Sequence, residues 1–524
     1  MPSHPAAGGT PEERFTTVCG HARRAAVLAS VEAVLGWDEQ TMMPRQAAAH
    51  RGSQAEAVAT LAHRLRTDPA QGEMLAALAE SDLAREGSAE VRATIRLLHQ
   101  DFTRQARVPE RLVGALAKTC VEAQHAWAAA RAESSWPRLE PWLQQVFDLK
   151  RELAACRLPA ADPYDSLLDE YEPGADWRSI AAVFARLRGA IVPLVRGCAD
   201  AARKPDDGAW RRLCPIDQQR ALVREVAARI GFDFDRGRLD TAEHPFCSGL
   251  GPHDCRITTR WDERWLPTAL YGVLHEAGHA LYEQGLPTDW YGLPAGEAAS
   301  LGIHESQSRL WENLVGRSPA FWRWCTGVVR RACPAGFADA DADADTLQRG
   351  LMVVRPSFIR VEADEVTYNL HVMMRFDLER AVVHGDLAVR DLPDAWNERF
   401  ARDFGITPPS AAEGVLQDIH WSAGLVGYFP TYALGNIFAA QLMVAARREL
   451  PDLDEEMAAG RFAGLLDWLR RNVHALGRQF DSTTLVERAT GEPVTERYLV
   501  ESLWRRYGDV HGLARPAEDG AAGT

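Results

Sequence analysis

The stretch His275-Glu-Ala-Gly-His279 constrains this chain more than any other feature of its sequence. Pro267 suits the first turn of a helix, and Gly285 followed by Pro287 suits its end, so we expect the stretch to be helical. Residues four apart lie above one another on a helix, so both imidazoles can reach a single ion. Glu276 lies between them, where it can act as a general base on water. The pattern therefore predicts a metalloprotease-type site.

A third protein ligand must come from elsewhere, because a catalytic zinc usually takes three and keeps one position open. Glu283 continues the helical stack, but three successive turns cannot converge on one point, so we expect a solvated or supporting carboxylate there. Glu297 follows His279 by 18 residues, close to the spacing of thermolysin-like enzymes. Glu305 falls on an amphipathic helical face, which favours it on local structure. From chemistry alone, the choice between Glu297 and Glu305 stays open.

Six motifs, each weak alone, occur in order along the chain. They are His244-Pro-Phe246, Asp254-Cys-Arg256-Ile-Thr258, His275-Glu-Ala-Gly-His279, His304-Glu-Ser-Gln307, Ile359-Arg360-Val-Glu-Ala-Asp364 and Gly414-Val-Leu-Gln417-Asp418-Ile-His420-Trp421. Together they resemble the thermostable carboxypeptidase (carboxypeptidase Taq) family of metallopeptidases. Supporting stretches extend the resemblance from about residue 12 to about residue 510, including Leu35–Asp38, Asp165–Gly174 and Gly427–Asn436.

This resemblance implies a ligand set, a fold and an activity. Glu305 is implied as the third ligand beside His275 and His279, holding one divalent metal per subunit, with zinc expected and cobalt as the alternative. The implied fold is mainly α, a single large helical body with a deep active-site groove, and the implied assembly is a homodimer. The implied activity is a carboxypeptidase that acts on peptides with a free C-terminus, with broad side-chain specificity and poor cleavage at proline.

A carboxypeptidase also needs a fixed cation for the terminal carboxylate, and arginine suits this because its planar fork binds both oxygens. The candidates are Arg256, Arg309, Arg355 and Arg360. The resemblance implies Arg360 as the anchor. An ion pair with Asp364, four residues later on a shared helix, is the alternative interpretation. Arg256 is expected to pair with Asp254 or Asp418.

Other polar residues of the motifs are expected around the same site. His420, Tyr428 and Tyr432 could donate hydrogen bonds to the substrate carboxylate or to the developing oxyanion, and aromatic packing is the alternative for each. Arg256 is expected in the substrate-binding wall. The residues expected to support the site without holding the metal are His244, Asp254, His304, Gln307, Asp364, Gln417 and Asp418.

The composition restricts partners and compartment. The formal net charge of −14 argues against nucleic acid and anionic membranes as partners. Nine cysteines without a C-x-x-C pair suggest reduced thiols in a cytoplasmic protein. The N-terminus does not resemble a signal peptide. The uncharged stretch 422–446 is expected to be a buried helix after a pocket-lining loop, because Pro430 and several glycines interrupt it.

Helical periodicity dominates the chain, and the best strand signal is Arg256–Trp261, so we expect a short antiparallel sheet near the metal helix. The expected organisation has disordered ends at 1–11 and 511–524 around one metallocarboxypeptidase domain at 12–510. Within that domain, a lid-like helical part covers about 12–150 and a catalytic part about 151–510. The alternating Asp and Ala of 339–345 predict a solvated surface turn.

Two rival functions remain open from the sequence. An oligoendopeptidase or dipeptidase would use the same metal apparatus on other substrates. A non-enzymatic scaffold with a structural zinc would also keep the histidines, but it would have no use for Glu276.

Overall fold

The computed structural model describes residues 9–338 and 342–515. Of the ends expected to be disordered at 1–11 and 511–524, residues 1–8 and 516–524 lie outside the described residues, as does part of the acidic turn at 339–345. Pro11 and His511 are helical instead, since α1 begins at Pro11 and α23 ends at His511. The helices are α1 (Pro11–Thr41), α2 (Ala48–Arg66), α3 (Pro69–Ala79), α4 (Asp82–Glu86), α5 (Ala89–Ala106), α6 (Glu110–Glu133), α7 (Trp136–Arg157), α8 (Pro163–Leu168), α9 (Trp177–Asp200), α10 (Ile216–Ile230), α11 (Pro267–Glu283), α12 (Leu301–Arg309), α13 (Pro319–Ala332), α14 (Pro334–Phe337), α15 (Ala344–Arg349), α16 (Glu365–His384), α17 (Leu392–Phe404), α18 (Pro430–Glu449), α19 (Leu453–Ala458), α20 (Ala463–Asn472), α21 (Ser482–Thr490), α22 (Arg497–Leu503) and α23 (Asp509–His511). The strands are β1 (Gly237–Thr241), β2 (Cys247–Gly251) and β3 (Asp254–Thr259).

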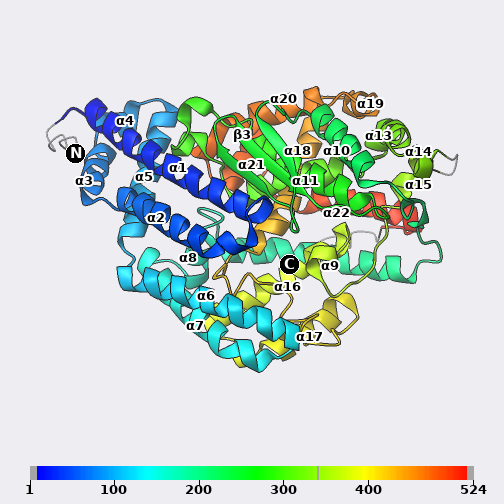
Figure 1. Cartoon of the computed structure of the whole chain (residues 1–524), viewed down its shortest axis with the longest axis horizontal. Helices are drawn as coiled ribbons and strands as arrows, with labels where there is room; N and C mark the ends of the chain where they lie inside the picture. The colour runs from blue at the N-terminus through cyan, green and yellow to red at the C-terminus, as the bar shows by residue number, and fades with distance from the viewer. Residues whose placement is uncertain (1–8, 339–341, 516–524) are drawn as a thin grey trace, which may run out of the picture.

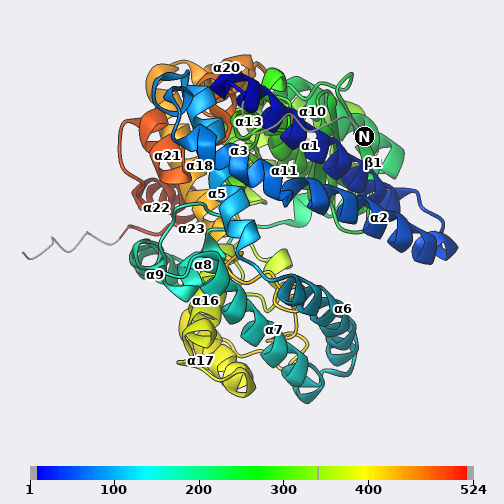
Figure 2. The same ribbon diagram turned by 90° about the vertical axis from the view of Figure 1, so that its left-hand side faces the viewer.

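The mainly helical fold expected from the sequence is confirmed. In space, the helices form a lower and an upper group. Figure 2 shows α6, α7, α16 and α17 in the lower part of the molecule, with α1, α10, α11, α13 and α18 above them. One hydrophobic core runs through both groups, from Leu112 to Tyr507. A smaller cluster of Val18, Met74, Leu75, Leu78 and Ile95 joins α1, α3 and α5. The N-terminal helices therefore carry a small core of their own.

The three-stranded sheet is mixed, where a purely antiparallel sheet was expected. Its order is β1-β3-β2, with β2 antiparallel and β1 parallel to β3. The parallel pair arises because the tight turn after β2 returns β3 into the space between β1 and β2. α11 contacts β2 and β3, and α1 contacts β2. Figure 1 shows β3 and α11 in the upper half of the molecule, so the sheet does lie beside the metal helix.

The long apolar stretch at 422–446 forms a loop followed by α18, most of whose residues are buried. This confirms the buried helix expected from the sequence. Among the described residues, no helix combines the length and apolar character that crossing a membrane requires.

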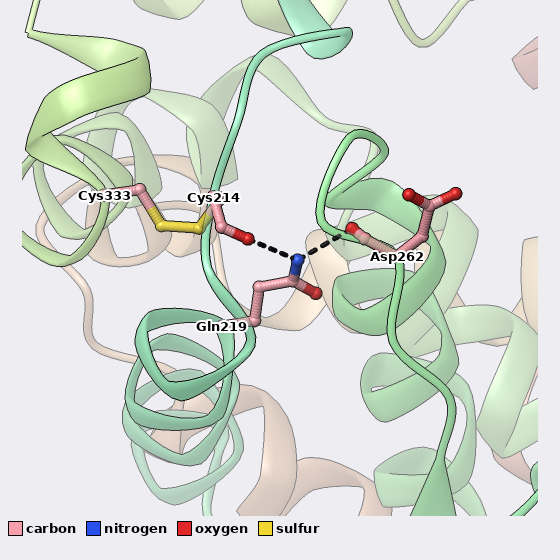
Figure 3. The surroundings of a disulfide bond; sticks show 4 residues. All are labelled: Cys214, Gln219, Asp262 and Cys333. Carbon is pink, nitrogen blue, oxygen red and sulfur yellow. Dashed lines mark hydrogen bonds between the residues drawn. A yellow bond between two sulfur atoms is a disulfide. The ribbon is translucent and has the colours of Figure 1, made fainter.

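One expectation about the cysteines is wrong. Cys214 and Cys333 form a disulfide across 119 residues of sequence, where nine reduced thiols were expected (Figure 3). The two residues come together because the segment before α10 packs against the end of α13, a contact that sequence spacing does not reveal. Gln219 fixes that segment, since its side-chain amide donates to the carbonyls of Cys214 and Asp262, both at 2.7 Å.

Candidate active site

α11 carries the two histidines of the first motif and begins at Pro267, as the sequence predicts. Its apolar face is fully buried, and this fixes the rotation of the helix about its axis. His275 and His279 therefore lie on the face opposite the apolar one. Gly278 allows α12 to approach closely, because a Cβ there would lie 2.6 Å from the carbonyl oxygen of Gln307. This close contact brings Glu305 of α12 to the two histidines.

His275, His279 and Glu305, called the metal cluster below, offer three ligand atoms within 4.8 Å of one another. Oε2 of Glu305 lies 3.7 Å from Nε2 of His275 and 3.3 Å from Nε2 of His279. Two imidazoles and one carboxylate match the donor set of a catalytic zinc and leave a coordination position open. Among the described residues, no other group of three or more such side chains meets this spacing.

Each histidine of the metal cluster has a partner at its other ring nitrogen. Nδ1 of His275 lies 2.8 Å from the carboxylate of Glu312. Nδ1 of His279 lies 2.6 Å from Nδ1 of His304, whose Nε2 lies 2.8 Å from Glu283. With Nδ1 of both ligands protonated, both Nε2 lone pairs point to the shared centre. Outer partners of this kind orient imidazoles for a metal, so the residues fit the ion.

Glu305 is held so that one oxygen faces the histidines. Arg309 donates to its Oε1 at 2.7 Å, and the Ser308 hydroxyl donates to Oε2 at 3.0 Å. Gly435 of α18 makes room for this side chain, since a Cβ there would lie 2.5 Å from Cγ of Glu305. The carboxylate is therefore fixed by α12 and α18 together.

Burial and charge shift the pKa values of this group in different directions. Burial alone lowers the pKa of His275, but Glu305 and Glu312 raise it to about 9. Burial lowers the pKa of His279 to about 4. Burial raises the pKa of Glu276 to about 7, opposed by His275. Burial also acts to raise the pKa of Glu305, yet Arg309 and His275 hold it well below its usual range.

A second group, called the arginine cluster below, consists of Arg360, Arg375 and Asp418. Nε and Nη2 of Arg360 donate to Oδ1 of Asp418 at 3.1 and 2.9 Å. Nε of Arg375 donates to the other oxygen, Oδ2, at 2.6 Å. Gln417 holds the backbone beside it, because its side-chain oxygen accepts from the Arg360 amide at 2.8 Å. One buried carboxylate thus accepts hydrogen bonds from two guanidinium groups.

Tyr368 of α16 lies between Arg360 of the arginine cluster and Arg309, which binds Glu305 of the metal cluster. Its hydroxyl accepts from Nη1 of Arg360 at 3.1 Å, and the guanidinium of Arg309 lies 4.4 Å from its ring centre. Tyr432 lies on the other side, with its ring 5.1 Å from Arg360 and its hydroxyl 3.3 Å from Nε2 of His420. Tyr428 packs edge-on against Tyr432 with ring centres 5.3 Å apart. The structure therefore brings Arg360, His420, Tyr428 and Tyr432 together.

The ion pair between Arg360 and Asp364, kept as an alternative above, is not formed. Arg360 lies in a short 3-10 turn, and Asp364 is the N-cap of α16, accepting from the amides of Val366 and Thr367 at 3.0 Å. The two residues share no helix because the chain extends between them. Asp364 supports the start of α16 instead.

The other expected residues lie at varied places. Arg256 donates to Asp254 at 2.9 and 2.8 Å and lies 4.3 Å from the Trp37 ring of α1, so it belongs to the sheet and the N-terminal helices. His244 is exposed between β1 and β2. Gln307 accepts from buried His474 at 3.0 Å. These residues do not join the arginine cluster.

Two other candidates have partners of their own. Glu297, the competing ligand, lies 3.6 Å from Arg478 and remains about half exposed. Arg355 is exposed and lies 3.8 Å from Asp207. Neither belongs to the metal cluster or the arginine cluster.

Sequence reasoning missed Arg375, Tyr368 and the role of Glu312. Arg375 and Tyr368 lie seven residues apart on one face of α16, a helical spacing that could have drawn attention to them. Glu312 follows Glu305 by seven residues on a continuous helix. Nothing in the sequence pairs these positions with Arg360 or His275, since the contacts join different elements.

A sequence model of one family, described as carboxypeptidase Taq (M32) metallopeptidase, matches residues 17–507. The chain belongs to this family. It is therefore a metallocarboxypeptidase, an enzyme that acts on peptides with the help of a divalent metal ion. The resemblance inferred from the six motifs is confirmed.

Named relatives cover nearly the whole chain. Thermostable carboxypeptidase 1 of Thermus thermophilus is 41% identical over 512 residues, which cover 96% of this chain and 100% of that protein. A solved M32 carboxypeptidase from Deinococcus radiodurans is 39% identical with a TM-score of 0.92, covering 96% of this chain and 100% of that one. Metallocarboxypeptidase 1 of Trypanosoma cruzi is 30% identical with a TM-score of 0.89, covering 94% and 99%.

Proposed function

We propose that this metallocarboxypeptidase removes C-terminal residues one at a time, with broad side-chain specificity and poor cleavage at proline. The observation that carries the proposal is the junction of a His–His–Glu metal cluster with a buried arginine cluster through Arg309 and Tyr368. A site built for internal peptide bonds has no need for a buried guanidinium beside the metal.

We assign the metal to His275, His279 and Glu305, with zinc as the ion and cobalt as the alternative. When bound, the ion supplies Lewis acidity toward the scissile carbonyl. Glu276 is buried in the same group without belonging to the three ligands, so it is the general base. It accepts the proton of the attacking water and passes it to the leaving amine.

The substrate carboxylate is assigned to Arg360, whose guanidinium can bind both of its oxygens. His420, Tyr428 and Tyr432 border the same space, and their ring N–H and hydroxyl groups donate to the carboxylate or to the developing oxyanion. Gln417 and Asp418 hold Arg360 in place. His304 fixes His279, while Asp254 with Arg256 shapes the sheet beside α11.

Further parts of the proposal concern the protein as a whole. The resemblance to the family supports a homodimer, a deep groove, and a lid-like role for the helices of about 12–150. The net charge of −14 supports a protein that binds neither nucleic acid nor an anionic membrane, and the seven free cysteines support a cytoplasmic location. Light scattering on the purified protein tests the dimer.

The experiment that tests the activity is a digest of one peptide followed by mass spectrometry, after the bound metal has been measured. We expect one equivalent of metal per chain and a ladder of products shortened from the C-terminus. Internal fragments would instead favour the rival oligoendopeptidase.

A further inference from the structure

Arg375 lies directly behind Asp418 and is fully buried on α16. Its Nε donates to Asp418, and its Nη1 donates to the carbonyl of His371 at 2.8 Å. Its guanidinium carbon lies 4.6 Å from the centre of the Trp396 ring. Because the side chain has no exposed surface, it cannot touch a peptide. Any role in binding must act through Asp418 and Arg360.

The charges of the arginine cluster do not cancel. Two guanidinium groups share one carboxylate, so the cluster keeps one positive charge. The neighbouring imidazoles add none, since burial lowers the pKa of His420 to about 4 and that of His371 well below its usual range. Burial lowers the pKa of Arg375 to about 10, opposed by Asp418, so it stays charged at neutral pH.

Without Arg375, Asp418 and Arg360 would form a closed neutral pair. An incoming carboxylate would then compete with Asp418 for the same guanidinium and meet no net attraction. Both oxygens of Asp418 would also be free to turn toward Arg360. With Arg375 bound to Oδ2, only Oδ1 is left for Arg360. The remaining positive charge faces a site that is poorly screened by water.

A second observation agrees with an electrostatic role. Within the described residues, Nη2 of Arg375 and Nε2 of His371 are buried and have no hydrogen-bond partner. A buried guanidinium that leaves a donor unpaired costs stability, because the lost hydration is not replaced. A purely structural position would favour an apolar side chain of similar volume.

We propose that Arg375 is a positioning residue that keeps the arginine cluster positively charged, so that Arg360 can attract the C-terminal carboxylate of a peptide. This inference rests on the proposed function, in which Arg360 is the anchor.

The test compares Arg375→Gln with Arg375→Lys, measuring KM and kcat for a free-acid peptide and the bound metal. Arg375→Gln should raise KM on the order of 10- to 100-fold, with kcat and metal content close to those of the wild type. Arg375→Lys should recover most of the lost affinity, because a point charge is enough behind Asp418. At Arg360, where the fork itself binds, Arg360→Lys should recover little.

Arg506→Gln is the matched control, because Arg506 is also a largely buried arginine paired with a carboxylate, Glu365 of α16. It should lower stability without changing KM. If Arg375→Gln does not fold, the double variant Arg375→Gln with Asp418→Asn decides. It removes one charge of each sign and leaves Arg360 as the single cation. Because the single positive charge is restored, we expect the double variant to prefer the free-acid peptide over the amidated one.

The outcomes separate this inference from the proposed function. A folded Arg375→Gln with wild-type KM overturns the inference, as does a raised KM that Arg375→Lys fails to lower or a double variant with no preference for the free acid. If Arg360→Ala also shows wild-type KM, the anchor itself is misassigned and the proposed function needs revision. If Arg360→Ala loses affinity while Arg375→Gln does not, the inference alone is wrong.

Discussion

The metal cluster and the arginine cluster lie side by side, joined through Arg309 and Tyr368, yet they are built in different ways. The metal cluster draws on two consecutive helices, α11 and α12, and two of its three residues are one turn apart. The arginine cluster joins a 3-10 turn, α16 and a loop near residue 418. Chemistry that depends on helical spacing can be recognised in a sequence, whereas a shared buried charge depends on the whole fold.

This comparison predicts that the metal cluster fails completely when one ligand is lost. Glu305→Ala should abolish metal binding and activity together, because it removes charge and geometry at once. Glu297→Ala should leave the metal content unchanged, since Glu297 lies by Arg478. Metal analysis of both purified variants checks the assignment, and the reverse pattern would return the site to the thermolysin-like spacing.

At the active site, metal binding and catalysis should be separable. Glu276→Gln should keep the metal and lower kcat by roughly three orders of magnitude or more, because the amide cannot accept the proton of water. Single-turnover kinetics and metal analysis on the same sample measure both quantities. Metal loss in step with activity loss would show that Glu276 is a ligand.

The partners behind the histidines should matter less than the ligands. Glu312→Gln should weaken metal affinity by about 10- to 100-fold, since Nδ1 of His275 loses its charged acceptor. Titration against a competing chelator measures this affinity. Unchanged metal affinity would mean that Glu312 does not support His275. Its role would then be to pair with Arg309, which donates to it at 3.1 Å.

A smaller effect is expected at Glu172, which follows α8 in the sequence and is buried against the first turn of α12. Its carboxylate accepts from the Gly302 amide and, at 2.7 Å, from the Ser482 hydroxyl. Burial raises its pKa from 4.5 to about 7, opposed by hydrogen bonds from Ser482 and Gly302. The folded state therefore gains stability below about pH 4.5, and this gain is lost as pH rises through about 7.

The measurement is the free energy of unfolding of the wild type and of Glu172→Gln between these two pH values. The wild type should become more stable relative to the variant as pH falls, by up to about 3 kcal/mol. A difference that does not change with pH would show that Glu172 is ionised in the folded protein throughout this range.

More of the metal cluster than of the arginine cluster could be predicted from the sequence. The helix from Pro267, the placement of His275, Glu276 and His279 on it, and the buried α18 all follow from periodicity and from proline and glycine signals. The choice of Glu305 over Glu297 needed the family resemblance, because both spacings are chemically reasonable. The structure then places Glu305 beside the histidines.

Long-range contacts explain what the sequence could not predict. Asp418 lies 58 residues from Arg360 and 43 from Arg375, so no local pattern links them. The parallel pairing of β1 with β3 depends on where a hairpin inserts. The Cys214–Cys333 disulfide likewise joins residues 119 apart. Each of these features is decided by packing between distant segments.

The central claim is that a metal site and a carboxylate anchor act together, and Arg360→Ala tests it most directly. The measurement is kcat/KM for one peptide as free acid and as C-terminal amide, in the wild type and the variant, with metal content recorded. We expect the variant to lose about 100-fold on the free acid, keep its metal and narrow the gap between the two peptides. Wild-type kinetics with an unchanged gap would contradict the account and move the anchor to the loop of Tyr428 and Tyr432.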